Sequence, residues 1–341
     1  MRVVELSDHG GPEVLVSGTR PVPVPAADQL LVRVGACGVC GHDGLARRGA
    51  LAARVGSVLG HEIAGRVEAA GADVPPGWVG RRVALVQRIP CGVCPDCSAG
   101  QTPRCRRGPG FYGEDLPGGY AELVVASPLN AVPLPDSVDD VTGALLSCAV
   151  GTGLRALRSA AVVAGDVVVV TGAGGGVGVH TVQLARHLGA TVVAVTGSAE
   201  KVEALREAGA TEVAVRPEAR ELRRIAAALG RPRGVDVVVE TTGAPTFALG
   251  LRALRPGGRL VLVGNTVPGD LPLDPGLVIV RELTVHGSAH ATRTDLEDVV
   301  DLVARGAVRP LAAHVWPLEQ AAAAHTALDS RALLGRAVLR P

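Results

Sequence analysis

The pattern of apolar and polar positions divides the chain into two parts with different local structure. The first part contains short apolar runs that are broken by glycine and proline. We expect strands at 3–6, 14–16, 30–35, 64–69, 82–86 and 121–125. Runs of this length, with turn residues between them at this spacing, are typical of a compact all-β unit.

The pattern changes after residue 148. Apolar runs of strand length then alternate with segments of helical period. We expect strands at 167–171, 191–196, 212–215, 235–240 and 259–263, and helices at 177–188, 199–208, 218–229 and 246–254. Regular alternation of strand and helix predicts a parallel, doubly wound sheet.

Two further features complete the predicted organisation. Pro256-Gly257-Gly258 is expected to form a tight connection between a helix and the next strand. From about residue 288 onward, helices at 294–305 and 317–328 and a strand at 335–339 indicate a return to the first part of the fold.

Composition restricts the class of protein. The chain has 341 residues, of which 47% are hydrophobic, and its net charge is +1. This length suffices for two domains, and the charge gives no electrostatic basis for binding nucleic acid or an anionic membrane. No apolar run can span a bilayer and no signal peptide is evident, so we expect a cytoplasmic protein that acts on a small-molecule substrate. Phe111, Tyr112 and Trp78 are expected to pack rather than to line a substrate pocket.

Six of the seven cysteines fall into two patterns that are typical of zinc sites. In a reducing cytoplasm, clustered cysteines indicate metal ligands rather than disulfides. The first pattern is local and consists of Cys91, Cys94, Cys97 and Cys105. Four thiolates at this spacing surround one tetrahedral Zn²⁺ without help from the rest of the fold. We therefore predict a structural zinc ion in this four-cysteine lobe.

The second pattern is scattered and consists of Cys40, the His61-Glu62 pair and Cys148. Two cysteines and one histidine leave a fourth coordination position open, as catalytic zinc sites do. The two patterns together predict two zinc ions per chain. Cys37 has no partner in either pattern and is expected to be a core residue.

A glycine-rich turn follows the first strand of the second part. Residues 171–178 read Thr-Gly-Ala-Gly-Gly-Gly-Val-Gly and open a helix. Gly172, Gly175 and Gly178 let the chain turn sharply, approach a pyrophosphate and pack helix against strand. Free N–H groups at the helix start, at Gly176 and Val177, would face the phosphates. We predict dinucleotide binding; the alternative is a tight turn without a ligand.

The end of the second strand bears on the choice of cofactor. It reads Thr196-Gly197-Ser198 and lacks the acidic residue that binds the ribose 2′-hydroxyl in NAD-selective sites. A 2′-phosphate would meet small hydroxyl groups there and Lys201, which is the only lysine of the chain. This favours NADP(H) over NAD(H). The alternative for Lys201 is a solvated helix residue.

The motifs occur in the order found in a known family. Residues 38–43 (Gly-Val-Cys-Gly-His-Asp), 60–62 (Gly-His-Glu), the four-cysteine lobe and 146–148 (Leu-Ser-Cys) resemble zinc-dependent medium-chain dehydrogenases over essentially the whole chain. The resemblance implies a GroES-like β-rich catalytic domain over 1–148, with a structural zinc lobe at 91–105. It also implies a Rossmann domain over 149–288, a return to the catalytic domain over 289–341, and a homodimer or homotetramer.

The resemblance also implies roles for single residues. Cys40, His61 and Cys148 are the ligands of the catalytic zinc, and Glu62 lies close behind them, where it can transiently approach the metal or act only as a hydrogen-bond acceptor. Asp43 holds the zinc-binding histidine, which fixes its tautomer and raises its basicity. Thr152 resembles a residue beside the nicotinamide.

His42 departs from the family pattern. Alcohol dehydrogenases of the family usually place Ser or Thr two residues after the ligand cysteine, where the hydroxyl passes the alcohol proton outward. A more distant histidine often completes that relay, and Leu45 occupies its place here. Because an imidazole exchanges protons near neutral pH, we hypothesise that His42 replaces the hydroxyl. The competing interpretation is an enzyme that does not oxidise alcohols.

Three functions follow from these features. The main hypothesis is reversible hydride transfer between NADP(H) and an alcohol or carbonyl compound, with Zn²⁺ as Lewis acid. Residues 10–15 and 286–292 resemble instead the quinone-reductase and zinc-containing enoyl-CoA or enone reductase side of the superfamily. Those enzymes use NADPH to reduce a C=C bond conjugated to a carbonyl. A binding protein with an idle cofactor site would be expected only if metal ligands had been lost, and all three are present.

Overall fold

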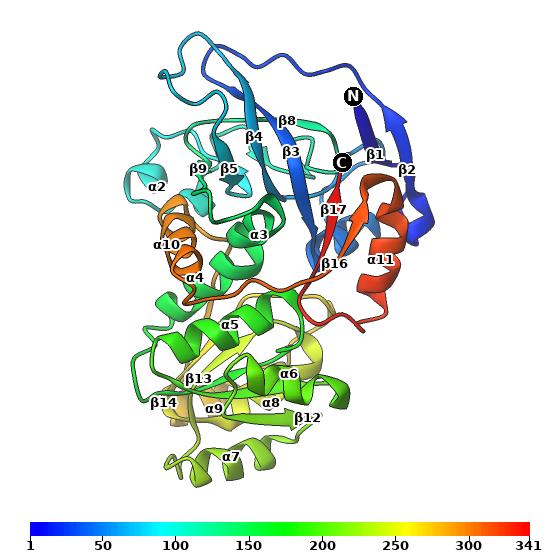
Figure 1. The fold of residues 1–341 in the computed structure, drawn as a ribbon. Helices are drawn as coiled ribbons and strands as arrows, with labels where there is room; N and C mark the ends of the chain where they lie inside the picture. The colour runs from blue at the N-terminus through cyan, green and yellow to red at the C-terminus, as the bar shows by residue number, and fades with distance from the viewer. The chain divides into compact units, whose positions relative to one another are not determined.

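The computed structural model describes residues 1–341, which fall into two compact units (Figure 1). The first unit contains Met1–Gly151, His290–Gly306 and Pro310–Pro341, and the second contains Thr152–Ala289 and Ala307–Arg309. The chain therefore leaves the first unit at Gly151 and returns to it at His290. None of the helices combines the length and the apolar character that a bilayer crossing requires.

The first unit is built around a seven-stranded sheet in the order β16-β17-β3-β4-β5-β9, with β8 paired to β3. These strands are β3 (Leu30–Val39), β4 (Glu62–Ala70), β5 (Arg82–Leu85), β8 (Leu123–Ala126), β9 (Ala131–Pro133), β16 (Ala312–Pro317) and β17 (Arg336–Arg340). The long β3 pairs antiparallel with β4, β8 and β17. A hairpin of β1 (Arg2–Leu6) and β2 (Leu15–Thr19) completes the predicted β-rich part.

The first unit has short helices, of which α2 (Pro95–Ser98) carries Cys97 of the four-cysteine lobe. Four others lie outside the lobe. They are α1 (Gly41–Arg47), α3 (Asp140–Leu145), α10 (Arg293–Ala304) and α11 (Ala321–Asp329). The pattern predicted the last two but not α1 or α3. Asp139 caps α3 by accepting a hydrogen bond from the N–H of Thr142. A π-helical turn, η3 (Leu146–Val150), follows directly and carries Cys148; such turns are frequent at functional sites.

The second unit contains a six-stranded parallel sheet in the order β12-β11-β10-β13-β14-β15. Its strands are β10 (Val167–Val170), β11 (Thr191–Thr196), β12 (Glu212–Val215), β13 (Val235–Glu240), β14 (Leu254–Leu262) and β15 (Thr284–Gly287). The order reverses between β10 and β13, which is the switch point of a dinucleotide-binding sheet. All four residues of β10 are buried, as expected of a strand covered on both faces.

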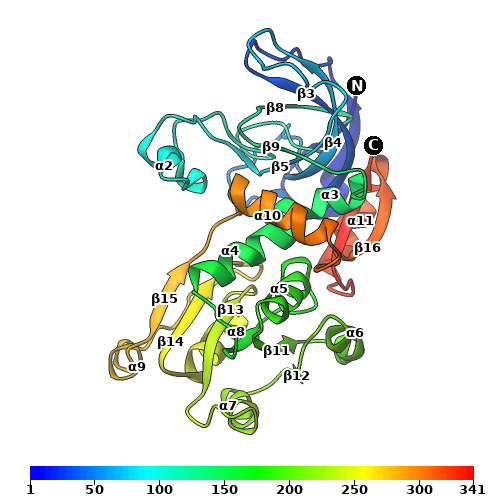
Figure 2. The same ribbon diagram turned by 60° about the vertical axis from the view of Figure 1, so that its left-hand side comes forward.

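Helices connect these strands as the alternating pattern predicted. They are α5 (Gly176–His187), α6 (Val202–Glu207), α7 (Ala219–Ala228) and α8 (Ala244–Ala253). The helix α9 (Pro275–Val280) and the edge strand β15 were not predicted, and Figure 2 shows them together at one end of the sheet. The predicted combination of a β-rich domain and a Rossmann-type domain with a doubly wound parallel sheet is confirmed.

One predicted connection is part of a strand. Pro256-Gly257-Gly258 lies inside β14, which begins at Leu254. Leu254 already pairs with Val235, and the register then shifts before Val237 pairs with Arg259. Gly257 adopts φ +71°, a conformation that favours glycine, so the turn residues form an irregular start of the strand rather than a separate loop.

Candidate functional site

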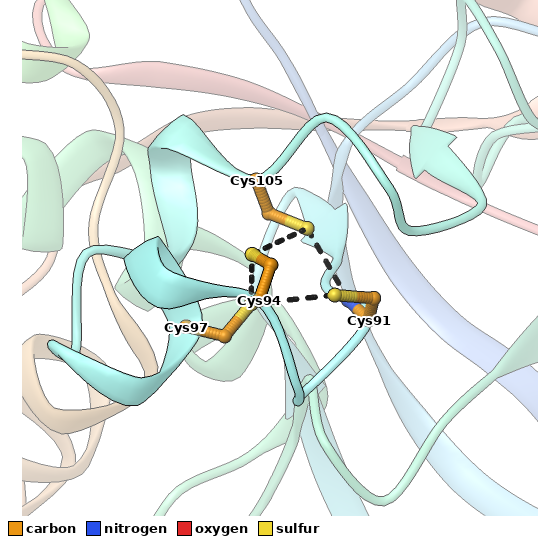
Figure 3. A group of neighbouring side chains, drawn as sticks. All are labelled: Cys91, Cys94, Cys97 and Cys105. Carbon is orange, nitrogen blue, oxygen red and sulfur yellow. Dashed lines mark hydrogen bonds between the residues drawn. The ribbon is translucent and has the colours of Figure 1, made fainter.

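The four-cysteine lobe is formed within one short stretch of the first unit. Its four sulfur atoms lie within 4.8 Å of one another, and Figure 3 shows their side chains pointing toward a common centre. Cys94 Sγ lies 3.5 Å from Cys97 Sγ and 3.9 Å from Cys105 Sγ. Tetrahedral zinc with Zn–S bonds of about 2.3 Å separates its sulfur ligands by about 3.8 Å, so the set fits one zinc ion.

Backbone groups of the lobe support anionic sulfur. The N–H of Cys91 donates to Cys105 Sγ over 3.3 Å. Burial opposes ionisation of this thiol, but N–H groups of Cys91, Arg107 and Gly108 outweigh it and lower the pKa of Cys105 to about 6. Because zinc binds the thiolate form of cysteine, this environment favours metal binding.

The scattered ligands meet in a second, fully buried cluster of the first unit. Cys40 follows β3, His61 precedes β4, and Cys148 lies in the π-helical turn, yet these ligand atoms and a Glu62 oxygen all lie within 4.8 Å of one another. Cys40 Sγ and Cys148 Sγ are 4.0 Å apart. A hydrogen bond from Cys148 lowers the pKa of the Cys40 thiol well below its usual value, despite burial. Two sulfurs and an imidazole at these separations fit a zinc ion with an open position.

Asp43 connects two of the ligand-bearing segments. Its Oδ2 accepts a hydrogen bond of 2.8 Å from the N–H of Cys40, and its Oδ1 accepts one of 3.2 Å from the N–H of Gly60. The same Oδ1 lies 3.4 Å from His61 Nδ1, which leaves Nε2 for a metal. Burial lowers the pKa of His61, but Asp43 and Cys40 outweigh it and raise the pKa well above its usual value. The cluster therefore favours positive charge, as expected of a cation site.

Glu62 is paired with an arginine that sequence analysis missed. Glu62 Oε1 lies 2.9 Å from Arg336 Nη2, and both side chains are buried, although the two groups are not aligned as a hydrogen bond. Burial raises the pKa of Glu62 to about 7, and the Arg336 charge opposes this shift. A Cβ atom on Gly38 would lie 2.9 Å from Glu62 Cβ and 2.1 Å from its Oε2, so a larger residue there would displace the Glu62 side chain. The only sequence signal for Arg336 is a charge at the start of an otherwise apolar strand.

His42 lies beside this buried cluster. Its Nε2 is 2.5 Å from Glu114 Oε1, and its ring centroid is 5.1 Å from that of His61. Phe111 packs against both rings at 5.1 Å and lies 5.6 Å from His290. Tyr112 is a core residue and Trp78 packs against the core, as expected, whereas Phe111 packs against site residues. Sequence analysis did not find Glu114, and it considered His290 only as part of the stretch 286–292 and not as a site residue.

Cys37 is separate from both clusters. It lies three residues before Cys40 and belongs to the buried hydrophobic core of the first unit. The expectation that Cys37 is a core residue is confirmed.

The glycine-rich turn of the second unit joins β10 to α5. Gly172 adopts φ +56°, and a Cβ atom on Gly178 would lie 2.3 Å from the Gly172 carbonyl oxygen. Gly175 is the N-cap of α5, and Gly176 and Val177 are its first residues. N–H groups in the first turn of a helix lack intrahelical partners and suit the pyrophosphate of a dinucleotide.

Thr152 also belongs to the second unit. It lies in α4 (Gly151–Ser159), and its Oγ1 is buried and has no hydrogen-bond partner in the protein. Because a buried hydroxyl without a partner is costly, this oxygen is suited to contact a ligand.

Lys201 is buried rather than solvated. It ends a short 3₁₀ turn, η4 (Ala199–Lys201), and is only 8% exposed. A Cβ atom on Gly174 would lie 2.6 Å from Lys201 Cδ, so the lysine side chain packs against the glycine-rich turn. Burial lowers the pKa of Lys201.

A second cation lies at the end of β11, where Thr196 is buried. Arg216, which follows β12, donates from Nε to the carbonyl oxygen of Gly197 over 2.9 Å. The N–H of Ser198 donates to Thr196 Oγ1 over 3.2 Å. Sequence analysis missed Arg216, because β12 and β11 are adjacent only in the folded sheet.

Comparisons with known proteins give the family of the chain. Residues 26–136 match the family model for the alcohol dehydrogenase GroES-like domain, and 176–305 match that for zinc-binding dehydrogenase. Acryloyl-coenzyme A reductase of Sulfurisphaera tokodaii is 31% identical over 94% of this chain and 95% of its own. NAD-dependent alcohol dehydrogenase of Saccharolobus solfataricus is 32% identical over the whole of both chains. The crystal structure of AibC matches with a TM-score of 0.92 at 43% identity, covering 100% of this chain and 96% of that one.

Proposed function

Because the chain belongs to the zinc-dependent medium-chain dehydrogenase/reductase family, we propose that it transfers hydride between NADP(H) and an alcohol or carbonyl substrate. The chain is an oxidoreductase of this family. The observation that carries the proposal is the buried cluster of Cys40, His61 and Cys148, whose donor atoms lie together with Glu62 within 4.8 Å. Three strong ligands around an open position suit a substrate oxygen.

Each residue of the cluster has a proposed role. When bound, zinc supplies a Lewis acid for the substrate oxygen and NADP(H) supplies or accepts the hydride. Cys40, His61 and Cys148 would hold the metal, and Asp43 orients the His61 ring through Nδ1. Glu62 lies behind the ligands, where Arg336 balances its charge. Metal analysis tests this arrangement: two zinc ions per chain are expected, and one would leave only the four-cysteine lobe.

His42 is the proposed proton-handling residue. Its Nε2 faces Glu114 Oε1 at 2.5 Å, so the pair holds a proton next to the cluster. Hydride transfer should slow by about tenfold to a hundredfold in His42→Ala, within the range of general acid–base catalysis. Single-turnover oxidation of NADPH measures this step. An unchanged rate removes His42 from the mechanism.

For the cofactor we propose a preference for NADP(H). Lys201 packs against the glycine-rich turn, Arg216 holds the end of β11, and no acidic residue occupies 196–198. Lys201→Ala should reduce the preference for NADPH over NADH about tenfold to a hundredfold, the effect of losing one charged hydrogen bond of ~1.5–3 kcal/mol. The control is Arg224→Ala, an exposed cation on α7.

The competing outcome, a preference for NAD(H), depends on Glu200. Its pKa is lowered by hydrogen bonds from its own N–H and from Ser198, and by the charges of Lys201 and Arg216. If this carboxylate binds the ribose 2′-hydroxyl, the wild-type enzyme prefers NADH, and Glu200→Gln weakens NADH binding. If the proposal holds, Glu200→Gln leaves NADPH preferred. Titration of NADPH and NADH into the wild-type protein and into Glu200→Gln decides between the two cofactor preferences.

A second function is favoured by one specific observation. A relative that is 31% identical over 94% of the chain is an acryloyl-coenzyme A reductase, which reduces a conjugated C=C bond. A panel of alcohols, aldehydes, enones and enoyl thioesters with NADPH or NADH separates the two functions. Product analysis by mass spectrometry and NMR identifies whether C=O or C=C is reduced. No cofactor turnover with any of these classes would contradict both.

We also propose that the protein forms a homodimer or homotetramer. This rests on the family alone, and sedimentation-velocity measurement of the purified protein tests it. A monomer at micromolar concentration would contradict it.

A further inference from the structure

One segment of the first unit connects the four-cysteine lobe to the buried cluster. It leaves the lobe at Cys105 and forms β7 (Gly110–Phe111), which pairs with β6 (Arg88–Ile89), two residues before the lobe begins. Arg88 Nη1 also donates to the carbonyl oxygen of Cys105 over 3.4 Å. Both strands of this small sheet are therefore attached directly to the lobe.

The segment then closes into a tight turn over residues 111–116. The N–H of Phe111 donates to Asp115 Oδ2 over 2.9 Å, and the N–H of Asp115 returns to the carbonyl oxygen of Phe111 over 3.0 Å. The N–H of Gly113 donates to the carbonyl oxygen of Leu116 over 2.8 Å. Gly113 adopts φ +86°, which another residue adopts only with strain. These crossing bonds fix the backbone from which the side chains of Phe111 and Glu114 project.

Two side chains of this turn reach the buried cluster. Glu114 Oε1 lies 2.5 Å from His42 Nε2, and the Glu114 side chain is only 18% exposed. Phe111 packs against the rings of His42 and His61 at 5.1 Å each. His42 belongs to the first turn of α1, two residues after Cys40. The turn therefore contacts both the ligand His61, through Phe111, and its neighbour His42, through Glu114.

We propose that Glu114 is a positioning residue for the buried cluster of Cys40, His61 and Cys148. Glu114 fixes the His42 ring beside this cluster, and the four-cysteine lobe fixes Glu114. The lobe thus sets the geometry of the side of the site where the substrate oxygen and its proton are handled. The inference rests on the proposed function for its kinetic consequence, but the contact itself is independent of any reaction. Sequence spacing gives no hint of it, because Glu114 and His42 are separated by 72 positions.

The first test compares variants of Glu114 in the complete, zinc-loaded protein. Glu114→Ala should lower kcat about tenfold, while the KM for NADPH and the zinc content stay unchanged, because neither ligand group is touched. Glu114→Gln keeps an acceptor oxygen and should recover most of the rate. The control, Asp136→Asn, removes a fully exposed carboxylate and should have no effect. Equal rates for Glu114→Ala and wild type would overturn the proposal.

A second measurement separates this inference from the proposed function. The ¹⁵N resonances of the His42 ring report its tautomer and environment without any substrate. Glu114→Ala should shift them, and Asp136→Asn should not. If the wild-type protein turns over no substrate but these resonances shift, the proposed function fails and the contact stands. If wild type is active and the resonances do not move, the inference fails alone.

The role of the lobe is tested by a double-mutant cycle. Cys97→Ser removes one sulfur from the lobe and should lower kcat at least as much as Glu114→Ala does. If the lobe acts through Glu114, the double variant is no slower than Cys97→Ser, because the two changes break one connection. Multiplicative effects would show that the lobe acts by another route. The His42 resonances of Cys97→Ser, which should shift as in Glu114→Ala, give the same answer if activity is lost altogether.

Discussion

The four-cysteine lobe and the buried Cys40-His61-Cys148 cluster are both suited to bind a metal, but they take their donor atoms from the chain in opposite ways. The lobe takes all its donors from residues 91–105, and two of the four are partly exposed. The buried cluster takes its donors from the end of β3, the start of β4 and a π-helical turn, and all of them are buried. The lobe therefore depends on local geometry, whereas the buried cluster depends on the correct folding of the whole first unit.

The two sites also differ in their surroundings. In the lobe, a backbone group supports the sulfur ligands: the N–H of Cys91 donates a hydrogen bond to Cys105 Sγ. Around the buried cluster lie further charges that must balance one another, namely Asp43, Glu62 and Arg336. Buried charges are costly unless they are paired. A closed set of ligands contributes stability, while an open set with charged neighbours is a less stable arrangement that is suited to chemistry.

The largest expected effect is that of losing the zinc ion of the buried cluster. His61→Ala removes one of three metal ligands and the Lewis acid with it, so activity should fall on the order of 10³-fold, about 4 kcal/mol of transition-state stabilisation. Zinc content should fall from two ions to one, with the lobe intact. Metal analysis and steady-state kinetics measure both.

The matched control for this prediction is Cys37→Ala. It removes a buried thiol three residues from Cys40 that belongs to neither cluster. Zinc content and rate should stay near wild type. Equal losses in the control and in His61→Ala would mean that disturbance of β3, rather than the metal, explains the result.

The second prediction concerns the long-range dependence of the buried cluster. Arg336→Leu leaves Glu62 buried without its partner, which should destabilise the protein by about 3–5 kcal/mol. The double variant Arg336→Leu, Glu62→Gln should recover most of this loss, because the unpaired charge is gone. Urea unfolding measures the free energies. If the single and the double variant are equally unstable, Arg336 does not balance the charge of Glu62.

These two regions also show how far the sequence alone could predict the molecule. The spacing of the lobe cysteines and of Gly172 and Gly178 determines local geometry, so these features were predictable residue by residue. Alternating strands and helices gave the fold class for the same reason. The buried cluster was proposed from residue types typical of catalytic zinc sites, and the resemblance to a family supported it, because nothing in the spacing of Cys40, His61 and Cys148 brings them together.

What could not be predicted arises from contacts between distant segments. Arg336 meets Glu62, and Glu114 meets His42, across 274 and 72 positions of the chain (336 − 62 and 114 − 42). Lys201 is an ordinary helix residue by pattern, and its packing against Gly174, 27 positions earlier (201 − 174), appears only in the folded chain. The π-helical turn at 146–150 has no periodic signal, since it inserts a wider turn into an apolar run.

The third prediction addresses the lobe. Cys94 is buried and lies next to both Cys97 and Cys105, so Cys94→Ser should abolish zinc binding in the lobe. Because metal binding and local folding are coupled, stability should fall by about 3 kcal/mol, and Tm by several degrees. Limited proteolysis should then cut within 91–105. The buried cluster should keep its own zinc ion, because it shares no donor with the lobe, and loss of both ions would show that the buried cluster binds zinc only when the lobe is intact.

The smallest expected effect is a pH dependence at the far end of α1, the helix that follows Cys40. Arg47 donates to His325 Nδ1 over 3.2 Å, so the neutral ring carries its proton on Nε2, which lies 2.9 Å from the Tyr120 hydroxyl. Burial lowers the pKa of His325 to about 4. The charged groups around it are Arg47, Arg48, Asp43 and Asp329.

The sign of the effect follows from the two pKa values of His325. An unfolded histidine has a pKa near ~6.5, so between pH 6.5 and about 4 the unfolded chain binds more protons than the folded one. Stability should therefore fall as pH is lowered through this range, by about 1 kcal/mol at pH 5.5 and about 3 kcal/mol at pH 4. His325→Gln removes the titrating ring, so its unfolding free energy should vary less with pH over this interval, although the variant starts from lower stability. His187→Gln, which changes an exposed histidine on α5, should keep the wild-type slope. If His325→Gln and wild type have the same slope, α1 is not anchored through a neutral His325, and the dependence of the buried cluster on distant residues would be limited to Arg336 and Glu114.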